Sequence, residues 1–235
     1  MKKPFLLLSI LLICSFAFAQ KKSKSKESKK DPKSTDYINV NVDEVKPKPD
    51  SATRFTGTIK YRITTDDPAD RDSMIMVFGE DKIKVTLFIA GYRADQTFEN
   101  SLIANFKDST LFSLDSRTKT YTVEKLEDRN KGTEFSLINS KRVSQILKYM
   151  CKEYKGDMKT KDADFEAAAL VSNQHSYLYA MDYNFLNIQP VVIGYRIVLG
   201  WRTKSAENEN TYIVAYEIIP GDVSGAFDTA GYKAR

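Results

Sequence analysis

The feature that most restricts the fold of this chain is a two-residue alternation of apolar and polar side chains. In residues 55–64 an apolar or small residue stands at every odd position, and Thr, Lys or Arg at every even one. This period is typical of a β-strand with one buried and one solvated face. Similar segments follow at 74–78, 83–89, 102–106, 111–114 and 121–126, separated by charged turns. Such consecutive strands predict one curved antiparallel sheet.

The second half of the chain is less uniform. Strands are expected at 191–202 and 212–219, and a helix near residues 176–185. Residues 139–156 are ambiguous. Val143, Ile146, Leu147, Met150 and Tyr154 follow a helical period, with Ser140 as N-cap and Gly156 as stop, whereas YMCKEY alone resembles a strand. Periodicity favours a helix here.

The N-terminus resembles a secretory signal peptide over residues 1–19. Lys2 and Lys3 precede an apolar run that ends with the small residues Ala17 and Ala19. The run is shorter than the roughly 20 residues of a spanning helix. Cleavage after Ala19 predicts an exported protein, periplasmic or extracellular and soluble. The alternative is a lipid anchor at Cys14, which is disfavoured because Ile13 stands where a lipidation site takes Gly, Ala or Ser.

Charge divides the rest of the chain into a tail and a domain. Residues 21–34 hold seven Lys and two acidic residues, net +5, whereas residues 35–235 carry net −2. We expect residues 20–53 to be a disordered tail and linker, and residues 54–235 to be one domain. The tail fits an anionic envelope surface as partner, although a solvated spacer is the simpler interpretation. Nucleic acid is not expected as a partner, because the domain has no basic face to match.

Residues that could carry catalysis are few. His175 is the single histidine, and a triad with Ser172 or Ser176 and Asp182 lacks the G-x-S-x-G signature. No metal site is expected, because one His and one Cys cannot bind zinc and the acidic turn at 66–72 lacks the order of a calcium loop. No cofactor motif is visible. The sequence therefore predicts a protein that is not an enzyme.

Cys151 is the single cysteine that remains after signal cleavage. A disulfide within the domain is then excluded, so the hydrophobic core must hold the fold together. The neighbours Lys148, Lys152 and Lys155 would favour a reactive thiolate. Packing of the thiol in the core is the favoured interpretation.

Several short motifs, taken in order, resemble a known family. These are FTGTIKYRIT, IANFKDSTLFSLDSRTKTY, ILKYMCKEYKG and GAFDTAGYK, with Lys148 in place of Gly and Ala230 in place of Pro. They resemble a family of exported bacterial domains of unknown function, itself similar to the outer-membrane lipoprotein carrier and sorting (LolA/LolB-like) fold. The resemblance implies a mainly β protein with minor α content. Its curved antiparallel sheet would form an incomplete barrel with one or two helices on the concave side. It also implies a strand at 149–154 and, as in such carriers, space for acyl chains.

Two functions follow as hypotheses. The first is a non-enzymatic binding module for a lipid or acyl chain, and the second a structural or interaction protein whose half-barrel is filled by its own side chains. Aromatic residues at 177–185 and in the last strands suit either a core or a pocket. Strand alternation predicts these ligand-lining residues on one apolar face: Ile59, Tyr61, Val85, Leu87, Tyr121, Val123, Trp201 and Tyr212.

Overall fold

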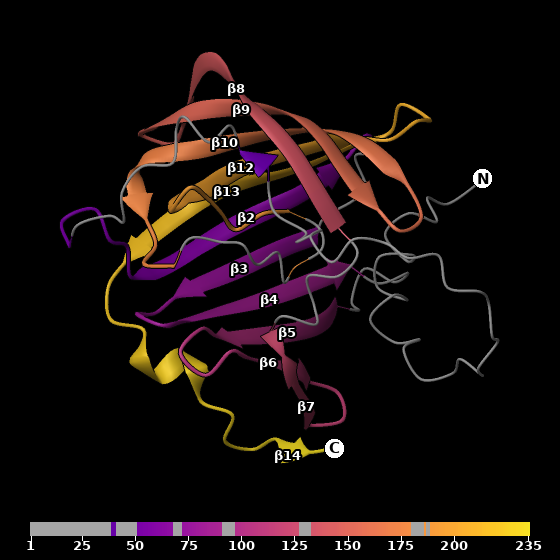
Figure 1. Ribbon diagram of the computed structural model, residues 1–235. Coiled ribbons are helices and arrows are strands. Elements are labelled where there is room, and N and C mark those ends of the chain that lie inside the picture. The colour runs from indigo at the N-terminus through magenta and orange to yellow at the C-terminus, as the bar shows by residue number, and fades with distance from the viewer. Residues whose placement is uncertain are drawn as a thin grey trace, which may run out of the picture. The chain divides into compact units, whose positions relative to one another are not determined.

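The computed structural model describes residues 39–40, 51–67, 72–90, 97–126, 133–179, 186 and 189–235. All of them belong to the compact unit Asp36–Arg235. The described residues are mainly strand (Figure 1). No helix among them is long and apolar enough to cross a membrane.

The strands run through the whole described part of the chain. The first seven are β1 (Asn39–Val40), β2 (Gly57–Thr65), β3 (Asp72–Phe78), β4 (Lys82–Ala90), β5 (Thr97–Asn105), β6 (Thr110–Asp115) and β7 (Thr120–Lys125). The others are β8 (Thr133–Ile146), β9 (Tyr149–Thr160), β10 (Asp164–Ser176), β11 (Val192–Ile193), β12 (Arg196–Lys204), β13 (Asn210–Pro220) and β14 (Lys233–Ala234).

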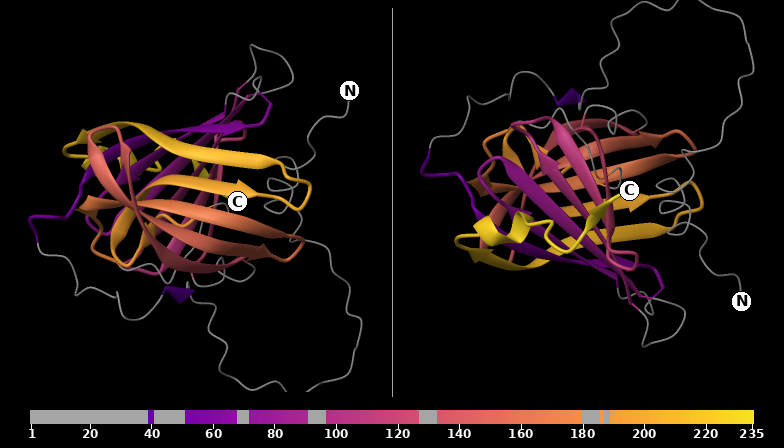
Figure 2. Two further views of the ribbon diagram at one scale, coloured as in Figure 1. Left: turned by 90° about the horizontal axis from the view of Figure 1, so that it is seen from above. Right: turned by 90° about the horizontal axis from the view of Figure 1, so that it is seen from below.

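These strands form one sheet in the order β1-β8-β9-β10-β12-β13-β2-β3-β4-β5-β6-β7-β14, with β11 pairing off this path to β12. Neighbours are antiparallel except at the two edges, where β1 pairs with β8 and β14 with β7 in parallel. The sheet is curved and does not close (Figure 2). The predicted fold class, a mainly β protein with a curved sheet that forms an incomplete barrel, is confirmed.

The inner face of the sheet, defined here as the face that carries Ile59 and Tyr61, holds the hydrophobic core. On β2, Ile59, Tyr61 and Ile63 are buried while Lys60 and Arg62 are not. The registers continue this face across the sheet, because Ile59 pairs with Met76 and Met76 with Val85. Alternation in the sequence therefore predicted the inward residues of these strands correctly.

Residues 139–146 and 149–156 belong to strands joined by a turn, so the strand that the resemblance implied at 149–154 is confirmed and the helix that periodicity favoured is not. β8 and β9 form a long hairpin, and three residues of β8, Ser140 to Arg142, lie opposite the single residue Glu153 between the pairs Asn139–Tyr154 and Val143–Lys152. This bulge accompanies a change in which side chains of β9 point inward: Tyr149 and Cys151 are buried before it, Tyr154 and Met158 after it. Three residues of the helical pattern, Val143, Leu147 and Met150, are exposed, so the period joined apolar side chains from both faces of the hairpin.

Two further irregularities lie at the same level of the sheet. Glu153 pairs with Leu170, where the register between β10 and β12 shifts. Gly200, the partner of Leu170, pairs with Val214, next to the shift between β13 and β2. Bulges bend strands and increase their twist. Their alignment across neighbouring strands accounts for the strong curvature of this half of the sheet.

The prediction of one or two helices on the concave side needs correction. Helix in the described residues is limited to the 3-10 helix η2 (Ser224–Phe227), which buries no residue, and to the single position Leu126. Of the helix predicted near 176–185, Ser176 ends β10 and residues 177–179 are not helical, while residues 180–185 lie outside the described set. Backbone pairing explains this, because Ser176 N donates to Thr53 O and Tyr177 N to Tyr195 O.

Parts of the predicted tail and linker contact the sheet. β1 pairs through Asn39 with Ser136 and through Val40 with Leu137. Closer to the domain, Arg54 bridges to Ser176, and the Ser176 hydroxyl donates to Thr53 O at 2.7 Å. Residues 1–38 and 41–50 lie outside the described residues, as does the predicted signal peptide.

Candidate functional site

Five of the eight predicted ligand-lining residues meet on the inner face. Ile59, Tyr61, Val85 and Trp201 belong to one hydrophobic core, with exposed fractions of 0%, 0%, 1% and 2%. Leu87 is partly buried and packs against the same core. A side chain with no accessible surface borders neither solvent nor a void that holds a water molecule. Protein atoms therefore fill the surroundings of Ile59 and Tyr61, and nearly all of the surroundings of Val85 and Trp201.

The other predicted lining residues, Tyr121, Val123 and Tyr212, lie on the opposite face. In the strand registers Tyr121 lies opposite Leu114, Leu114 opposite Ser101, and Ser101 opposite Thr86. Thr86 follows the inward Val85 and so lies on the outward side of the sheet, as does Tyr121. Val123 is 51% exposed, and Tyr212 adjoins the buried Ile213. β7 carries apolar residues on its outward side, where the rings of Tyr121 and Phe112 lie 5.8 Å apart. Alternation identifies the residues that share a face but not which face is inside.

The core is closed by specific contacts between distant strands. The Tyr61 hydroxyl on β2 donates to the backbone oxygen of Val198 on β12 at 2.8 Å. The rings of Phe135 and Trp201 meet edge to face at 5.4 Å. Ala169 on β10 lies between Tyr154 and Trp201 in the register, so a small residue makes room for two large ones. Burial raises the pKa of Tyr61 far above its usual range, so its hydroxyl stays neutral.

Residues 177–179 cover the core next to the turns of β3–β5. Tyr177 is buried, packs edge to face on Phe78 and Phe106, and donates its hydroxyl to Lys82 O at 3.1 Å. Tyr179 stacks on Phe106 with ring centroids 5.0 Å apart. These described aromatics of the tyrosine-rich segment thus form part of the core. Tyr183 and Phe185 lie outside the described residues.

His175 lies between two aromatic rings. Its ring centroid is 4.5 Å from that of Tyr149 and 4.9 Å from that of Phe55. Burial, and next the charge of Lys148, lower its pKa, which favours neutral imidazole. Both serines of the proposed triad bond to the backbone: Ser172 Oγ accepts from His175 N at 3.0 Å, and Ser176 Oγ donates to Thr53 O. The third member, Asp182, lies outside the described residues.

The Cys151 thiol is completely buried in the core. Burial raises its pKa to about 11, so at neutral pH it is a protonated thiol and a poor nucleophile. The structure thus agrees with the interpretation that the sequence favours, a thiol packed in the core. The neighbouring lysines do not lower its pKa, because Cys151 points inward from β9 while Lys152 is partly exposed.

Two acidic residues of the 66–72 turn act as hydrogen-bond acceptors. Asp66 Oδ2 accepts from Asn210 N, and Asp72 Oδ1 from Ala90 N, both at 2.8 Å. In the described residues, no three His, Cys, Asp or Glu side chains gather as metal ligands would. Asp70 lies outside the described set. Asp66 and Asp72 thus join neighbouring strands.

Two polar side chains in the core have no described hydrogen-bond partner. The amide of Gln189 is completely buried with both its oxygen and its nitrogen unpaired, and Trp201 Nε1 is likewise unpaired. Unpaired buried polar atoms are rare in folded proteins and costly. Nothing in the sequence around Gln189 signals this, whereas the buried Met74, Met76 and Phe78 could have been added to the predicted face from alternation alone.

Comparisons with known proteins assign no family. No family model matches the chain, and no curated protein matches it. Two solved structures of PNGF-II, in space groups C2 and P21, each align with a TM-score of 0.47 and 12% sequence identity. Each alignment covers 77% of this chain but only 31% of the PNGF-II chain. A likeness of this degree assigns no function.

Proposed function

We propose that this protein is a non-enzymatic interaction protein of the cell envelope, with a half-barrel filled by its own side chains. The observation that carries the proposal is the complete burial of Ile59 and Tyr61, together with the near-complete burial of Val85 and Trp201. A carrier in its empty state should leave accessible apolar surface at such positions. The inner face instead serves as the core, which leaves the outer surface and the hairpin ends to meet partners.

The side chains that could act as nucleophile or base also support a non-enzymatic role. The Cys151 thiol is buried and protonated, and His175 Nε2 is enclosed without a described partner. The hydroxyl groups of Ser172 and Ser176 are engaged with backbone groups. A nucleophile and a base in hydrogen-bond contact, which acyl transfer requires, are not found among these residues.

The second candidate is a carrier of a lipid or acyl chain. The unpaired amide of Gln189 and the indole of Trp201 favour it, because a ligand headgroup could satisfy them. Native mass spectrometry of the purified protein tests this directly, since a carrier is expected to retain lipid.

The substitution Leu87→Trp distinguishes a self-filled half-barrel from a lipid carrier. In a filled core the larger side chain overpacks, and we expect the free energy of unfolding to fall by about 1–3 kcal/mol. Neither the parent protein nor the variant should then bind a fluorescent fatty acid. Val123→Trp is the matched control, because Val123 is 51% exposed on the outer face. A carrier would show the reverse: fatty-acid binding by the parent, weakened by Leu87→Trp with stability unchanged.

Export remains part of the proposal. The charged, apolar and small-residue regions of residues 1–19 support cleavage after Ala19. N-terminal sequencing of the protein from an envelope fraction should give Gln20 as the first residue. A mature N-terminus at lipidated Cys14 would replace the soluble assignment with an anchored one.

A further inference from the structure

The end of the β8–β9 hairpin has one face in the core and one face outside. Residues 143–152, here called the hairpin tip, comprise the last part of β8, a two-residue loop and the first part of β9. Ile146, Tyr149 and Cys151 are buried. Their inward packing fixes the direction of the tip, and the side chains between them point outward.

The outward side of this hairpin is unusually apolar. Val143 is 55% exposed, Leu147 46% and Met150 44%, and Ile138 further along β8 is 63% exposed. These are four of the eight large apolar side chains that are exposed among the described residues. Single exposed apolar residues need no explanation, but such a concentration indicates a surface that contacts something else.

Leu147 at the turn has an unfavourable backbone conformation. Its φ angle is +53°, in the left-handed region that Gly or Asn adopts readily and a bulky residue does not. A two-residue hairpin loop normally places Gly, Asn or Asp at such a position. The chain thus presents a large apolar side chain at the extreme end of the hairpin, at a cost in stability. Retained strain of this kind is a sign of function.

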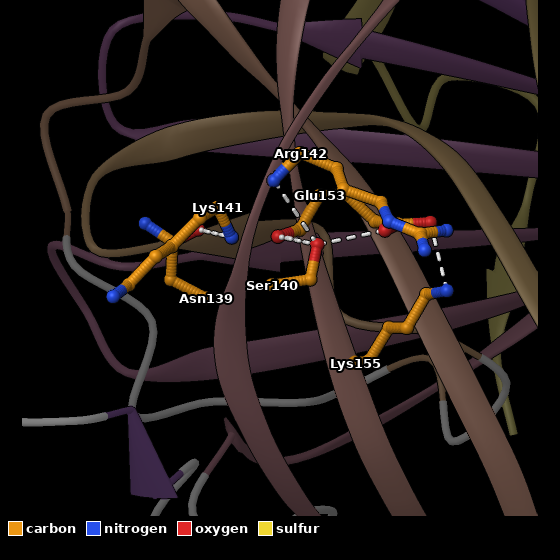
Figure 3. A network of polar contacts seen from close by, with 6 residues as sticks. All are labelled: Asn139, Ser140, Lys141, Arg142, Glu153 and Lys155. Atoms are coloured by element: carbon orange, nitrogen blue, oxygen red, sulfur yellow. Dashed lines mark hydrogen bonds and ion pairs between the residues drawn. The ribbon is translucent and has the colours of Figure 1, made fainter.

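Positive charge surrounds these apolar residues. Residues 139–155 hold five cationic side chains and one carboxylate, net +4, while residues 35–235 as a whole carry −2, so the rest carries −6. The one carboxylate, that of Glu153, is held within the bulge (Figure 3): it accepts from Ser140 Oγ at 2.7 Å and pairs with Lys155 Nζ at 3.4 Å. Lys141, Arg142 and Lys148 are exposed, and no ion pair within the described residues neutralises them.

We propose that the hairpin tip docks on an anionic lipid surface, with Leu147 and Met150 entering the interface and the surrounding cations contacting lipid phosphates. Exposed apolar side chains ringed by Lys and Arg are the combination that such a surface binds, because apolar burial and attraction to anionic headgroups act together. A neutral apolar surface would not account for the local excess of positive charge. The Lys-rich tail would add electrostatic attraction without insertion.

Fluorescence at the tip tests insertion separately from attraction through the tail. The protein from Gln20 to Arg235 with Leu147→Trp is mixed with vesicles of phosphatidylcholine and phosphatidylglycerol. We expect its emission to shift to the blue with these vesicles and not with phosphatidylcholine alone. The native Trp201 is 2% exposed and gives a constant background. Val123→Trp is the control and should show no shift.

Sedimentation with the same vesicles measures the contribution of each group. Leu147→Asn should lower the partition coefficient about tenfold, as expected from removing a buried Leu side chain from an apolar phase. The double change Lys148→Gln and Lys152→Gln should lower it more than tenfold and reduce its salt dependence. Asn accepts a positive φ readily, so loss of binding in Leu147→Asn would not reflect misfolding.

Three outcomes would overturn the proposal. In the first, the protein sediments with anionic vesicles but the Leu147→Trp emission does not move, so that the tail alone binds. In the second, nothing binds. In the third, the emission moves with protein concentration in the absence of vesicles, which would assign the tip to contact with a second copy.

Discussion

Tyr61 shows how single polar groups organise the core. Its ring lies among apolar side chains of β2 and its neighbours, and its hydroxyl reaches the backbone of β12. Val198, which supplies the acceptor, lies next to the register shift between β10 and β12. The hydrogen bond therefore satisfies a backbone group at a point where the ladder is irregular.

Tyr61→Phe is predicted to be destabilising by about 1–2 kcal/mol. The ring remains, but the buried oxygen of Val198 loses its donor, and an unsatisfied buried acceptor costs roughly this much. Denaturant unfolding measures the change. Tyr212→Phe, on the outer face, is the control and should be neutral within about 0.5 kcal/mol. Equal effects of the two changes would show that Tyr61 makes no special contribution.

Because the Cys151 thiol is buried, we expect the free energy of unfolding to depend on pH in the alkaline range. Its pKa is raised from 9.0 to about 11 by burial, so the folded protein holds the thiol proton more tightly than the unfolded chain does. This contribution is complete below pH 9 and is lost as the pH rises from 9 to 11. The loss should reach about 2 kcal/mol. Cys151→Ala, although less stable at neutral pH, should show a shallower fall over this interval in urea unfolding; an identical slope would contradict the assignment.

At the scale of elements, the sequence predicted regular strands well and irregular ones poorly. β2 and β3 keep one inward parity throughout their buried positions, so alternation located them. Beside Glu153, the β9 positions whose side chains point inward change from odd to even numbers. A bulge that causes such a change has no signature in a pattern of apolar and polar residues. Ala-rich β10 carries little strand signal of its own, and Ala169 is small where Tyr154 and Trp201 lie opposite it.

We expect the β8–β9 hairpin to be sensitive to any side chain added at Gly156 on β9. A Cβ at this position would collide with Ser136 O on β8, within the paired part of the hairpin. Gly156→Ala should therefore force the strands apart and lower the free energy of unfolding by more than about 2 kcal/mol. Thermal and denaturant unfolding measure this. Gly225→Ala is the matched control, since nothing lies within 4 Å of its Cβ position. A neutral Gly156→Ala would mean that the two strands adjust freely.

At the scale of the whole domain, both edges of the open sheet are covered by the chain's own terminal segments. β1 lies along β8, and β14 lies along β7 (Figure 1). Uncovered edges invite pairing with other chains, so short covering strands reduce this risk. The sequence predicted the curved sheet because local alternation is sufficient for it. Long-range register decides which strands become edges, which face is inside and which candidate residues meet. A single sequence does not contain that information directly.

The two covering segments should differ in importance, and truncation from either end tests this. A chain that begins at Ser51 loses only the two-residue strand β1 among the described elements, so its free energy of unfolding should stay within about 1 kcal/mol of the parent. A chain that ends at Asp222 loses more. Phe227 lies against Gly79, Tyr232 against Lys119, and Lys233 N and Arg235 N donate to Lys119 O and Tyr121 O.

We expect the C-terminal truncation to lower the free energy of unfolding by about 1–3 kcal/mol, because it removes apolar contacts together with the parallel pairing on β7. It should also promote self-association, since the exposed edge of β7 carries Tyr121 and the 51% exposed Val123. Urea unfolding and analytical ultracentrifugation measure the two effects. A larger loss on removing residues before Ser51 would instead make the pairing of β1 with β8 the principal support of the sheet edge.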